Sequence, residues 1–186
     1  MPRAEREARM LDAAGTAFAR HGFHGASMDD IAAASGISKP MLYNYFGSKE
    51  GLYSEYVSRS GRALVAAMRD AAPPDASAEE RLTAGISTFL DYVDEHRTGW
   101  QVLYHEVAAQ GGPFAAEVAA LRSRVVDMVA RAVGKDESSE AFAHALVGAG
   151  ESLANWWLLH PDVPRAELAG LLLRLAGFVE EPRARP

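Results

Sequence analysis

Apolar residues recur along the chain at the spacing of helices, and glycines, prolines and capping residues separate one helix from the next. Leu11, Ala14 and Phe18 share one side of a first helix, which ends at Gly22 before the apolar Phe23. Three later stripes have the same 3.6-residue period: Leu82, Ile86, Phe89, Leu90 and Val93; Phe114, Val118, Leu121, Val125, Met128 and Val129; and Leu168, Leu171, Leu172, Leu175 and Val179. Because no segment alternates with period two, the pattern predicts an all-α fold of nine helices.

The second and third predicted helices are short and close together. Ser27 caps the second helix, with Asp30 completing an approximate capping box, and residues 35–37 break that helix after about two turns. Ser38 caps the third helix and Gly47 ends it. Two short helices joined by a tight turn that contains glycine are typical of a helix-turn-helix.

The remaining boundaries divide the rest of the chain into six helices. Prolines mark the clearest break, at 73–75. Before this break, Ser48 caps a helix running towards Ala72, and after it Ser77 and Glu80 form a capping box for the next helix. A short helix from Trp100 to Val107 is closed by residues 111–113, and the long helix that follows ends near Gly134. Ser138 or Ser139 caps a helix that reaches Leu159, and residues 160–164 form the turn before the last helix.

The third predicted helix has two different faces. At 100° per residue, Leu42 and Phe46 share the side that would pack on the first two helices. The opposite side is centred on Asn44, with Tyr43 and Tyr45 on its two borders. Such a helix fits the major groove of DNA, with its apolar side as the anchor.

The charge distribution permits this interpretation although the net charge is −6. Residues 1–52 carry six basic and six acidic side chains, so the whole deficit lies in the remainder of the chain. Cysteine is absent, which excludes disulfides, thiolate metal sites and cysteine nucleophiles. No apolar run is long enough for a membrane span and residues 1–6 do not resemble a signal peptide, so we expect a cytoplasmic protein.

The sequence offers little to support an enzyme. His21 and His24 flank Gly22 without a third ligand nearby, and the six histidines lack the usual helical metal spacing. There is no glycine-rich phosphate loop and no nucleophile elbow. We therefore expect a binding protein without a cofactor or a metal.

Two stretches carry a family resemblance. Residues 27–32 (SMDDIA) and 35–50 (SGISKPMLYNYFGSKE) resemble the DNA-binding signature of TetR-family transcriptional regulators. The length and the number of helices are also similar to that family. The resemblance implies a helix-turn-helix domain at 1–50, a helical ligand-sensing and dimerisation domain at 51–186, and operator DNA as the partner.

The resemblance assigns DNA contacts residue by residue. Tyr43 and Tyr45 correspond to aromatic positions that touch phosphates and sugars, Lys39 and Lys49 to basic positions at helix starts, and Ser27 to a hydroxyl that meets a phosphate. The full candidate set is Ser27, Ser38, Lys39, Pro40, Met41, Tyr43, Asn44, Tyr45 and Lys49. Met41 departs from the small residue usual at its position, which leaves Asn44 as a candidate base reader.

Each of these residues also has a simpler interpretation. The two tyrosines serve equally well as packing residues with polar tips, and the lysines as ordinary solvated side chains. Ser27 and Ser38, like Ser48, are helix caps. Only two lysines of the motif, Lys39 and Lys49, are available in each chain. They imply modest affinity, so we expect a homodimer that doubles the contacts.

The larger part of the chain predicts pairing and sensing. The last helix is rich in leucine and the one before it contains Ala145, Gly148, Ala149 and Gly150, and the resemblance implies that these two helices pair across a two-fold axis. The alternative is packing within one monomer.

Aromatic and flexible apolar residues of the middle helices are candidates for binding a small, largely apolar effector, together with two polar residues. The candidate set is Phe89, Tyr92, Trp100, Leu103, Tyr104, Met128, Glu151, Asn155 and Trp156. Phe114 and the pair His105 and Glu106 are further options. Residues of these types more often belong to the core or the surface.

The predicted function is a ligand-responsive transcriptional regulator, a repressor that a small apolar molecule releases from its operator. The alternative is a ligand-independent DNA-binding or scaffold protein on the same fold. An enzyme built on a helical bundle comes third.

Overall fold

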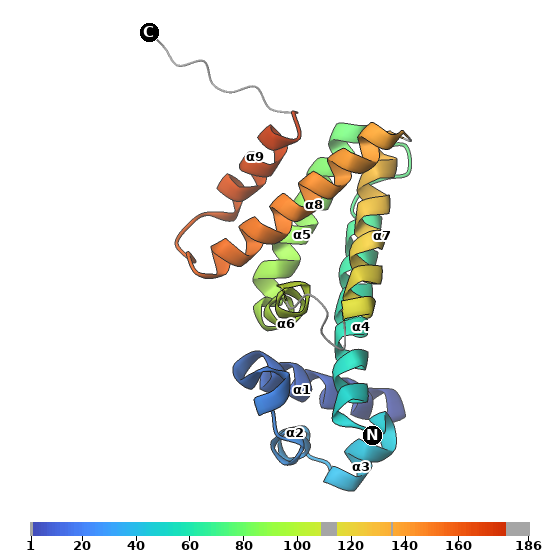
Figure 1. Cartoon of the computed structure of the whole chain (residues 1–186), viewed down its shortest axis with the longest axis vertical. Coiled ribbons are helices and arrows are strands. Elements are labelled where there is room, and N and C mark those ends of the chain that lie inside the picture. Colours follow the sequence, from blue (N-terminus) through green and yellow to red (C-terminus); the bar gives the residue numbers. More distant parts are fainter. Residues whose placement is uncertain (1, 109–114, 135, 178–186) are drawn as a thin grey trace. The chain divides into compact units, whose positions relative to one another are not determined.

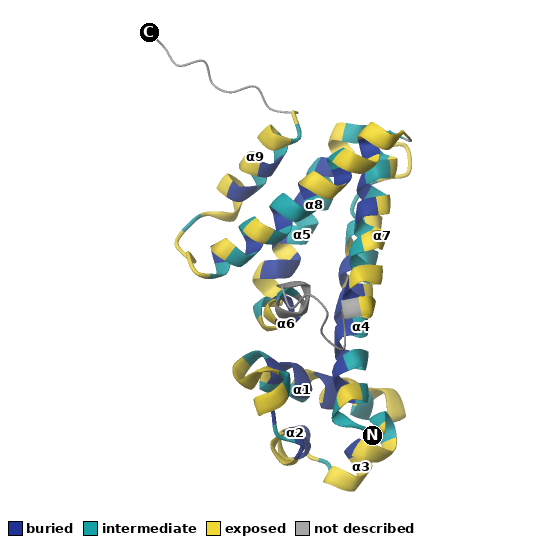
Figure 2. Cartoon of the chain, viewed as in Figure 1, coloured by how far each residue is buried: buried dark blue, intermediate teal, exposed yellow. Residues whose placement is uncertain are grey.

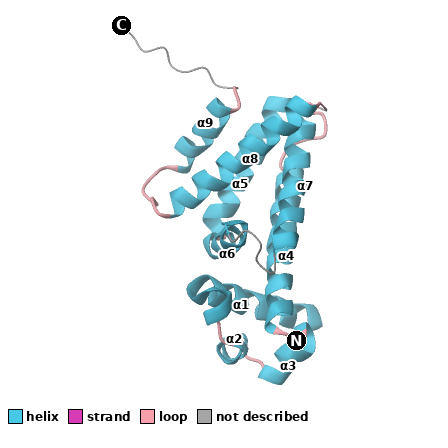
Figure 3. Ribbon diagram, in the orientation of Figure 1, coloured by secondary structure: helices cyan, strands magenta, loops and turns pink. Residues whose placement is uncertain are grey.

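The computed structural model describes residues 2–108, 115–134 and 136–177 (Figure 1). Within these ranges the chain forms nine helices and no strand, which confirms the predicted all-α fold (Figure 3). The helices are α1 (Arg3–Gly25), α2 (Met28–Ser35), α3 (Lys39–Phe46), α4 (Lys49–Asp70), α5 (Ala78–Glu95), α6 (Arg97–Ala108), α7 (Ala115–Val133), α8 (Glu137–Leu158) and α9 (Arg165–Leu175). In the described part of the chain, no helix is long and apolar enough to cross a membrane. Phe114 and Val179, expected in two apolar stripes, and the expected turn at 111–113 lie outside the described residues.

Several predicted boundaries are confirmed in atomic detail. The Ser27 hydroxyl accepts hydrogen bonds from the backbone N–H groups of Asp29 and Asp30, at 3.2 and 3.4 Å. Ser77 and Glu80 form the reciprocal capping box at the start of α5. Gly36 ends α2 in the left-handed region, at φ 69°, which glycine adopts without steric cost.

Three boundaries differ from the expectation. The first helix is interrupted at Gly22 (φ 66°, ψ 175°), as predicted, but a further turn carries α1 on to Gly25. Ser38 is the N-cap residue of α3, as predicted, but its side chain makes no capping hydrogen bond. The cap of α8 is Asp136, not Ser138 or Ser139, because its carboxylate accepts from the backbone N–H of Ser139 at 2.8 Å.

Contacts divide the chain into two units. The first unit comprises residues 1–62 and 98–119. Its core at α1, α2, α3 and α4 contains Phe18, Ile31, Leu42 and Tyr53, all buried (Figure 2). The rings of Phe18 and Tyr53 meet edge to face with centroids 4.7 Å apart, which joins α1 to α4.

The second unit comprises residues 63–97 and 120–186, and α5 packs there against α8 and α9. The stripe predicted on α5 is buried at Leu82, Ile86, Leu90 and Val93. The indole N–H of Trp157 donates to the carbonyl of Val163 at 2.8 Å, and this bond holds the turn before α9 against α8. The domain division predicted at residue 50 stays a prediction.

Candidate nucleic-acid interface

The turn between α2 and α3 is held by backbone hydrogen bonds. Gly36 N–H donates to the Ala33 carbonyl and Ile37 N–H to the Ala32 carbonyl, both at 3.1 Å. The buried Ser35 hydroxyl donates back to the Ile31 carbonyl at 2.7 Å, so this polar group is satisfied inside the core. The three-residue connection therefore sets α3 at a defined angle to α2, as a helix-turn-helix requires.

One side of α3 is anchored and the other is open to solvent. Leu42 has 0% of its surface exposed, which fixes the inner side. Met41 and Tyr43 are exposed at 39% and 40%, large fractions for side chains of their size. The exposed candidates on α3 are Lys39, Pro40, Met41, Tyr43 and Asn44 (Figure 2). The helix thus presents one surface that could enter the major groove of DNA.

Lys39 is paired with an acid on the neighbouring helix. Its Nζ lies 2.8 Å from Oδ2 of Asp29, and both side chains are solvent-exposed. The hydrogen bond to Asp29, aided by the opposite charge, raises the pKa of Lys39 above its ordinary value. Lys39 therefore carries its charge at neutral pH, but Asp29 offsets that charge on the same surface.

Tyr45 lies on the opposite border of α3 and contacts the first turn of α1. Arg6 Nε donates to the Tyr45 hydroxyl at 3.1 Å, and the guanidinium carbon of Arg3 lies 5.2 Å from the centre of the Tyr45 ring. Neither arginine was among the candidates predicted from the sequence. Their spacing of three residues indicates a shared side of α1, but no local signal points to a tyrosine 39 residues away from Arg6.

Lys49 has a local structural role. Its Nζ donates to the carbonyl of His24 at 3.0 Å and lies 5.1 Å from the centre of the Phe23 ring. These contacts tie the end of α1 to the start of α4. Ser48 caps α4 through Gly51 N–H at 3.0 Å, as predicted.

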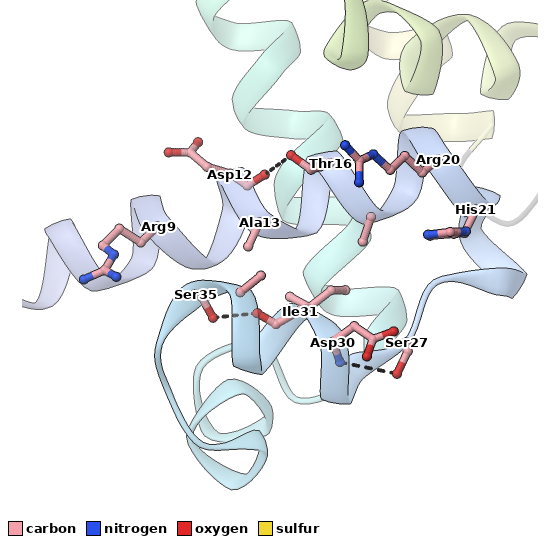
Figure 4. Close-up of a pocket in the computed structure, with 12 residues that line it drawn as sticks. Arg9, Asp12, Ala13, Thr16, Arg20, His21, Ser27, Asp30, Ile31 and Ser35 are labelled. Atoms are coloured by element: carbon pink, nitrogen blue, oxygen red, sulfur yellow. Dashed lines mark hydrogen bonds between the residues drawn. The ribbon is translucent and has the colours of Figure 1, made fainter.

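A surface groove of about 470 Å³ lies between α1 and α2 (Figure 4). No pattern in the sequence predicted it. Figure 4 shows His21 of α1 above Asp30 of α2 and Ser27, the N-cap of α2, with Arg9 and Asp12 nearer the N-terminus of α1. Its lining residues are Arg9, Asp12, Ala13, Thr16, Ala17, Arg20, His21, Ser27, Asp30, Ile31, Ala34 and Ser35. The lining mixes both signs of charge, so the groove is not a simple anion site.

The effector candidates of the second unit have varied surroundings. The Tyr92 ring stacks on His96 with centroids 4.4 Å apart, and Glu151 accepts from Arg122 Nε at 3.0 Å. Trp156 is 44% exposed and stacks on His160. Phe89, Met128 and Asn155 are half-buried.

The other effector candidates belong to the first unit or are not described. Trp100 and Tyr104 of α6 lie in the first unit, with ring centroids 6.4 Å apart. The side chains of Leu103, His105 and Glu106 lie outside the described residues, as does Phe114.

The two helices expected to pair carry exposed apolar side chains. They are Trp156 and Leu159 at the end of α8, and Leu171 and Leu175 on α9. Leu168 and Leu172 of α9 are buried within the unit. α9 therefore has an inner row of leucines that packs on its own chain and an outer row that does not.

Comparison with known proteins shows similarity over most of the chain. Residues 10–56 match the profile described as "Bacterial regulatory proteins, tetR family", and residues 78–178 match "Tetracyclin repressor-like, C-terminal domain". The HTH-type transcriptional activator FasR of Mycolicibacterium smegmatis is 31% identical, over 85% of this chain and 74% of that protein. The HTH-type transcriptional repressor SCO4008 of Streptomyces coelicolor is 29% identical, over 88% and 84% respectively.

A solved structure is similar as well. The crystal structure of a TetR-like transcriptional regulator from Rhodococcus sp. RHA1 is 40% identical and has a TM-score of 0.84. The match covers 95% of this chain and 96% of that one. Both parts of the chain are thus similar to proteins that are named as transcriptional regulators.

Proposed function

The chain belongs to the TetR family and is a DNA-binding transcriptional regulator rather than an enzyme, and we propose that it is a homodimeric repressor that a small, largely apolar molecule releases from its operator. The single observation that carries the DNA-binding part is the open face of α3. Leu42 anchors the helix while Asn44 and its neighbours point to solvent.

The candidate residues divide into two kinds of contact. Asn44, at the centre of the open face, is the base reader, since an amide can pair with adenine through two hydrogen bonds. Met41 beside it offers apolar contact to a thymine methyl group. The positioning contacts go to phosphates, from Ser27 and Ser38 at helix starts, from Lys39 and Lys49, and from Tyr43 and Tyr45 at the borders of α3, with Pro40 packing beside them.

The exposed side of α9 supports pairing of two chains through α8 and α9. Leu171 and Leu175 are apolar, exposed and one turn apart, and burying such a row against its symmetry mate is favourable. A dimer also presents two α3 helices, which DNA half-sites one helical turn apart require.

The effector proposal rests on the aromatic and flexible apolar residues of α5, α7 and α8. Half-buried Phe89 and Met128 offer apolar contact, while Glu151 and Asn155, four residues apart on α8, supply polar groups. The Arg122 partner of Glu151 adds a fixed cation beside that carboxylate. This combination suits a mostly apolar molecule with one polar end.

The decisive experiment is fluorescence anisotropy with DNA from upstream of the protein's own gene, beside a scrambled fragment. We expect tight binding to the native fragment, and we expect Asn44→Ala to remove about 1–3 kcal/mol of discrimination for each half-site. Gln101→Ala, which removes an exposed amide from α6, is the matched control. Equal, weak binding to both fragments would contradict the proposed regulation of its own gene.

The effector and the direction of regulation need separate measurements. Screening apolar compounds for release of the labelled fragment tests the effector. A promoter–reporter assay tests repression, and a fall in transcription on deleting the gene would contradict it.

A further inference from the structure

Two arginines at the start of α1 contact the same tyrosine on α3, the helix proposed to enter the major groove. Arg6 Nε donates to the Tyr45 hydroxyl at 3.1 Å, and Arg3 lies over the ring of the same tyrosine with 5.2 Å between the guanidinium carbon and the ring centre. Tyr45 is half-buried, whereas Arg3 is exposed. These three side chains, which we name the Tyr45 flank, therefore form one cluster at the border of the open face of α3.

The opposite border of α3 is built differently. Tyr43 and Tyr45 are about 200° apart around the helix at 100° per residue. Lys39 lies one turn before Tyr43 and is paired with Asp29 at 2.8 Å. On this side Lys39 contacts a carboxylate, whereas on the other side Arg3 and Arg6 both contact Tyr45.

This arrangement matches the geometry of the major groove. A helix with its side chains is about 10–12 Å wide and the groove is about 12 Å wide, so the two borders of an inserted helix face the two phosphate backbones. A guanidinium has five N–H donors, so Arg6 has others besides the Nε–H that contacts Tyr45. A guanidinium also matches the geometry of a phosphate.

Resting on the proposed DNA-binding function, we propose that Arg3 and Arg6 each bind a backbone phosphate of the operator, with Tyr45 holding both guanidinium groups in place. The Tyr45 flank is thus a second basic element of the interface, from the first turn of α1. It supplies affinity on any DNA sequence, while Asn44 supplies discrimination.

The test is the salt dependence of DNA binding by the full-length protein. The slope of log K against log salt is negative, and removing one phosphate contact makes it shallower by about 0.9. Arg3→Gln or Arg6→Gln therefore makes it shallower by about 1.8 in a dimer. Between 50 and 200 mM salt, the affinity of such a variant therefore falls about tenfold less than that of the wild type. The same change is expected on native and scrambled DNA.

Arg20→Gln is the matched control, since it removes the same charge from the other end of α1. A slope change in Arg3→Gln and Arg6→Gln no larger than in Arg20→Gln overturns the proposal. Circular dichroism and thermal unfolding of each variant show that the helices are intact.

Tyr45→Phe separates direct phosphate binding from mere positioning. Phenylalanine keeps the ring beneath Arg3 but removes the hydroxyl that Arg6 contacts, so we expect weaker binding with a nearly unchanged salt slope. Equal losses of affinity in Arg6→Gln and Tyr45→Phe, with unchanged slopes in both, overturn the direct contact. If the wild type bound no DNA at all, the proposed function itself would fail, and the flank with it.

Discussion

The ring of Tyr56 on α4 lies directly against Gly15 on α1, so closely that a β-carbon at residue 15 would overlap it. Tyr56 is buried, and its ring centroid lies 6.4 Å from that of Phe18. The missing side chain at residue 15 therefore lets α1 and α4 approach each other. This contact helps to fix the start of α4 beside the proposed DNA-binding helices.

Gly15→Ala is expected to destabilise the protein by about 1–3 kcal/mol through overpacking against Tyr56. The change is informative because alanine otherwise favours a helix over glycine by about 1 kcal/mol. Gly85→Ala is the matched control, since α5 leaves open space around Gly85, and we expect a gain of about 0.5–1 kcal/mol there. Urea unfolding of both variants measures the difference. A stabilised Gly15→Ala variant would contradict the close packing.

Asp29→Asn is expected to increase affinity for DNA. The carboxylate of Asp29 lies 2.8 Å from Lys39 and offsets the charge that Lys39 brings to its proposed phosphate contact. Asp29→Asn removes this offset. The salt slope should steepen by about 0.9 for each protomer. Asp30→Asn removes the same charge from the adjacent residue and serves as the control. Equal effects of the two variants would show that only net charge matters, and not the pairing of Asp29 with Lys39.

The capping box of α5 predicts a pH-dependent stability. Hydrogen bonding of the Glu80 carboxylate to the backbone N–H and the hydroxyl of Ser77 lowers the pKa of Glu80 below its ordinary value. Its stabilising effect is therefore complete at pH values above the ordinary glutamate pKa, and it is lost as the pH falls through the lower, folded pKa.

Thermal unfolding of Glu80→Ala across pH measures this effect. We expect a lower Tm than the wild type at pH 7, and a difference that shrinks as the pH falls below about 4.5. Glu79→Ala, in the same turn, is the control. A Tm difference that stays constant down to about pH 3 would show that the carboxylate form of Glu80 is not what stabilises the helix start.

Leu175→Asp is expected to dissociate the proposed dimer. Leu175 is 62% exposed on α9, so the substitution is tolerable within one chain but places two like charges in the proposed interface. Analytical ultracentrifugation should show a monomer with intact helical circular dichroism. Val133→Asp, an exposed apolar position at the end of α7, is the control. A Leu175→Asp protein that remains dimeric would move the interface away from this face of α9.

Local features of the fold were predictable from neighbouring residues. Ser27, Gly36 and the Ser77–Glu80 box act through groups within four positions, so sequence spacing alone locates them. The helix cap that was predicted wrongly, at the start of α8, also depends on local residues. The sequence offered Ser138 or Ser139 as the cap of α8, whereas the carboxylate of Asp136 accepts from Ser139 N–H. Both kinds of side chain are good caps, and spacing does not rank them.

The candidate site was predictable only in part. The periodicity of α3 separates buried Leu42 from exposed Asn44, because one anchored face suffices to orient a short helix. It does not reveal that Asp29 engages Lys39, or that Arg122 engages Glu151 from another helix. Those partners lie 10 and 29 positions apart, and exposed charges have several alternative partners within reach.

The sequence by itself determined the nine helices of the described chain, the apolar stripes of several of them, and the helix-turn-helix signature, because these depend on residues within a few turns of one another. Tertiary structure alone decided that Arg6 meets Tyr45 across 39 positions. That contact requires the start of α1 to lie near Tyr45 of α3, and the packing of α1 on α2 and of α2 on α3 sets this position. Side-chain partners across helices follow from such packing, and no local pattern encodes it.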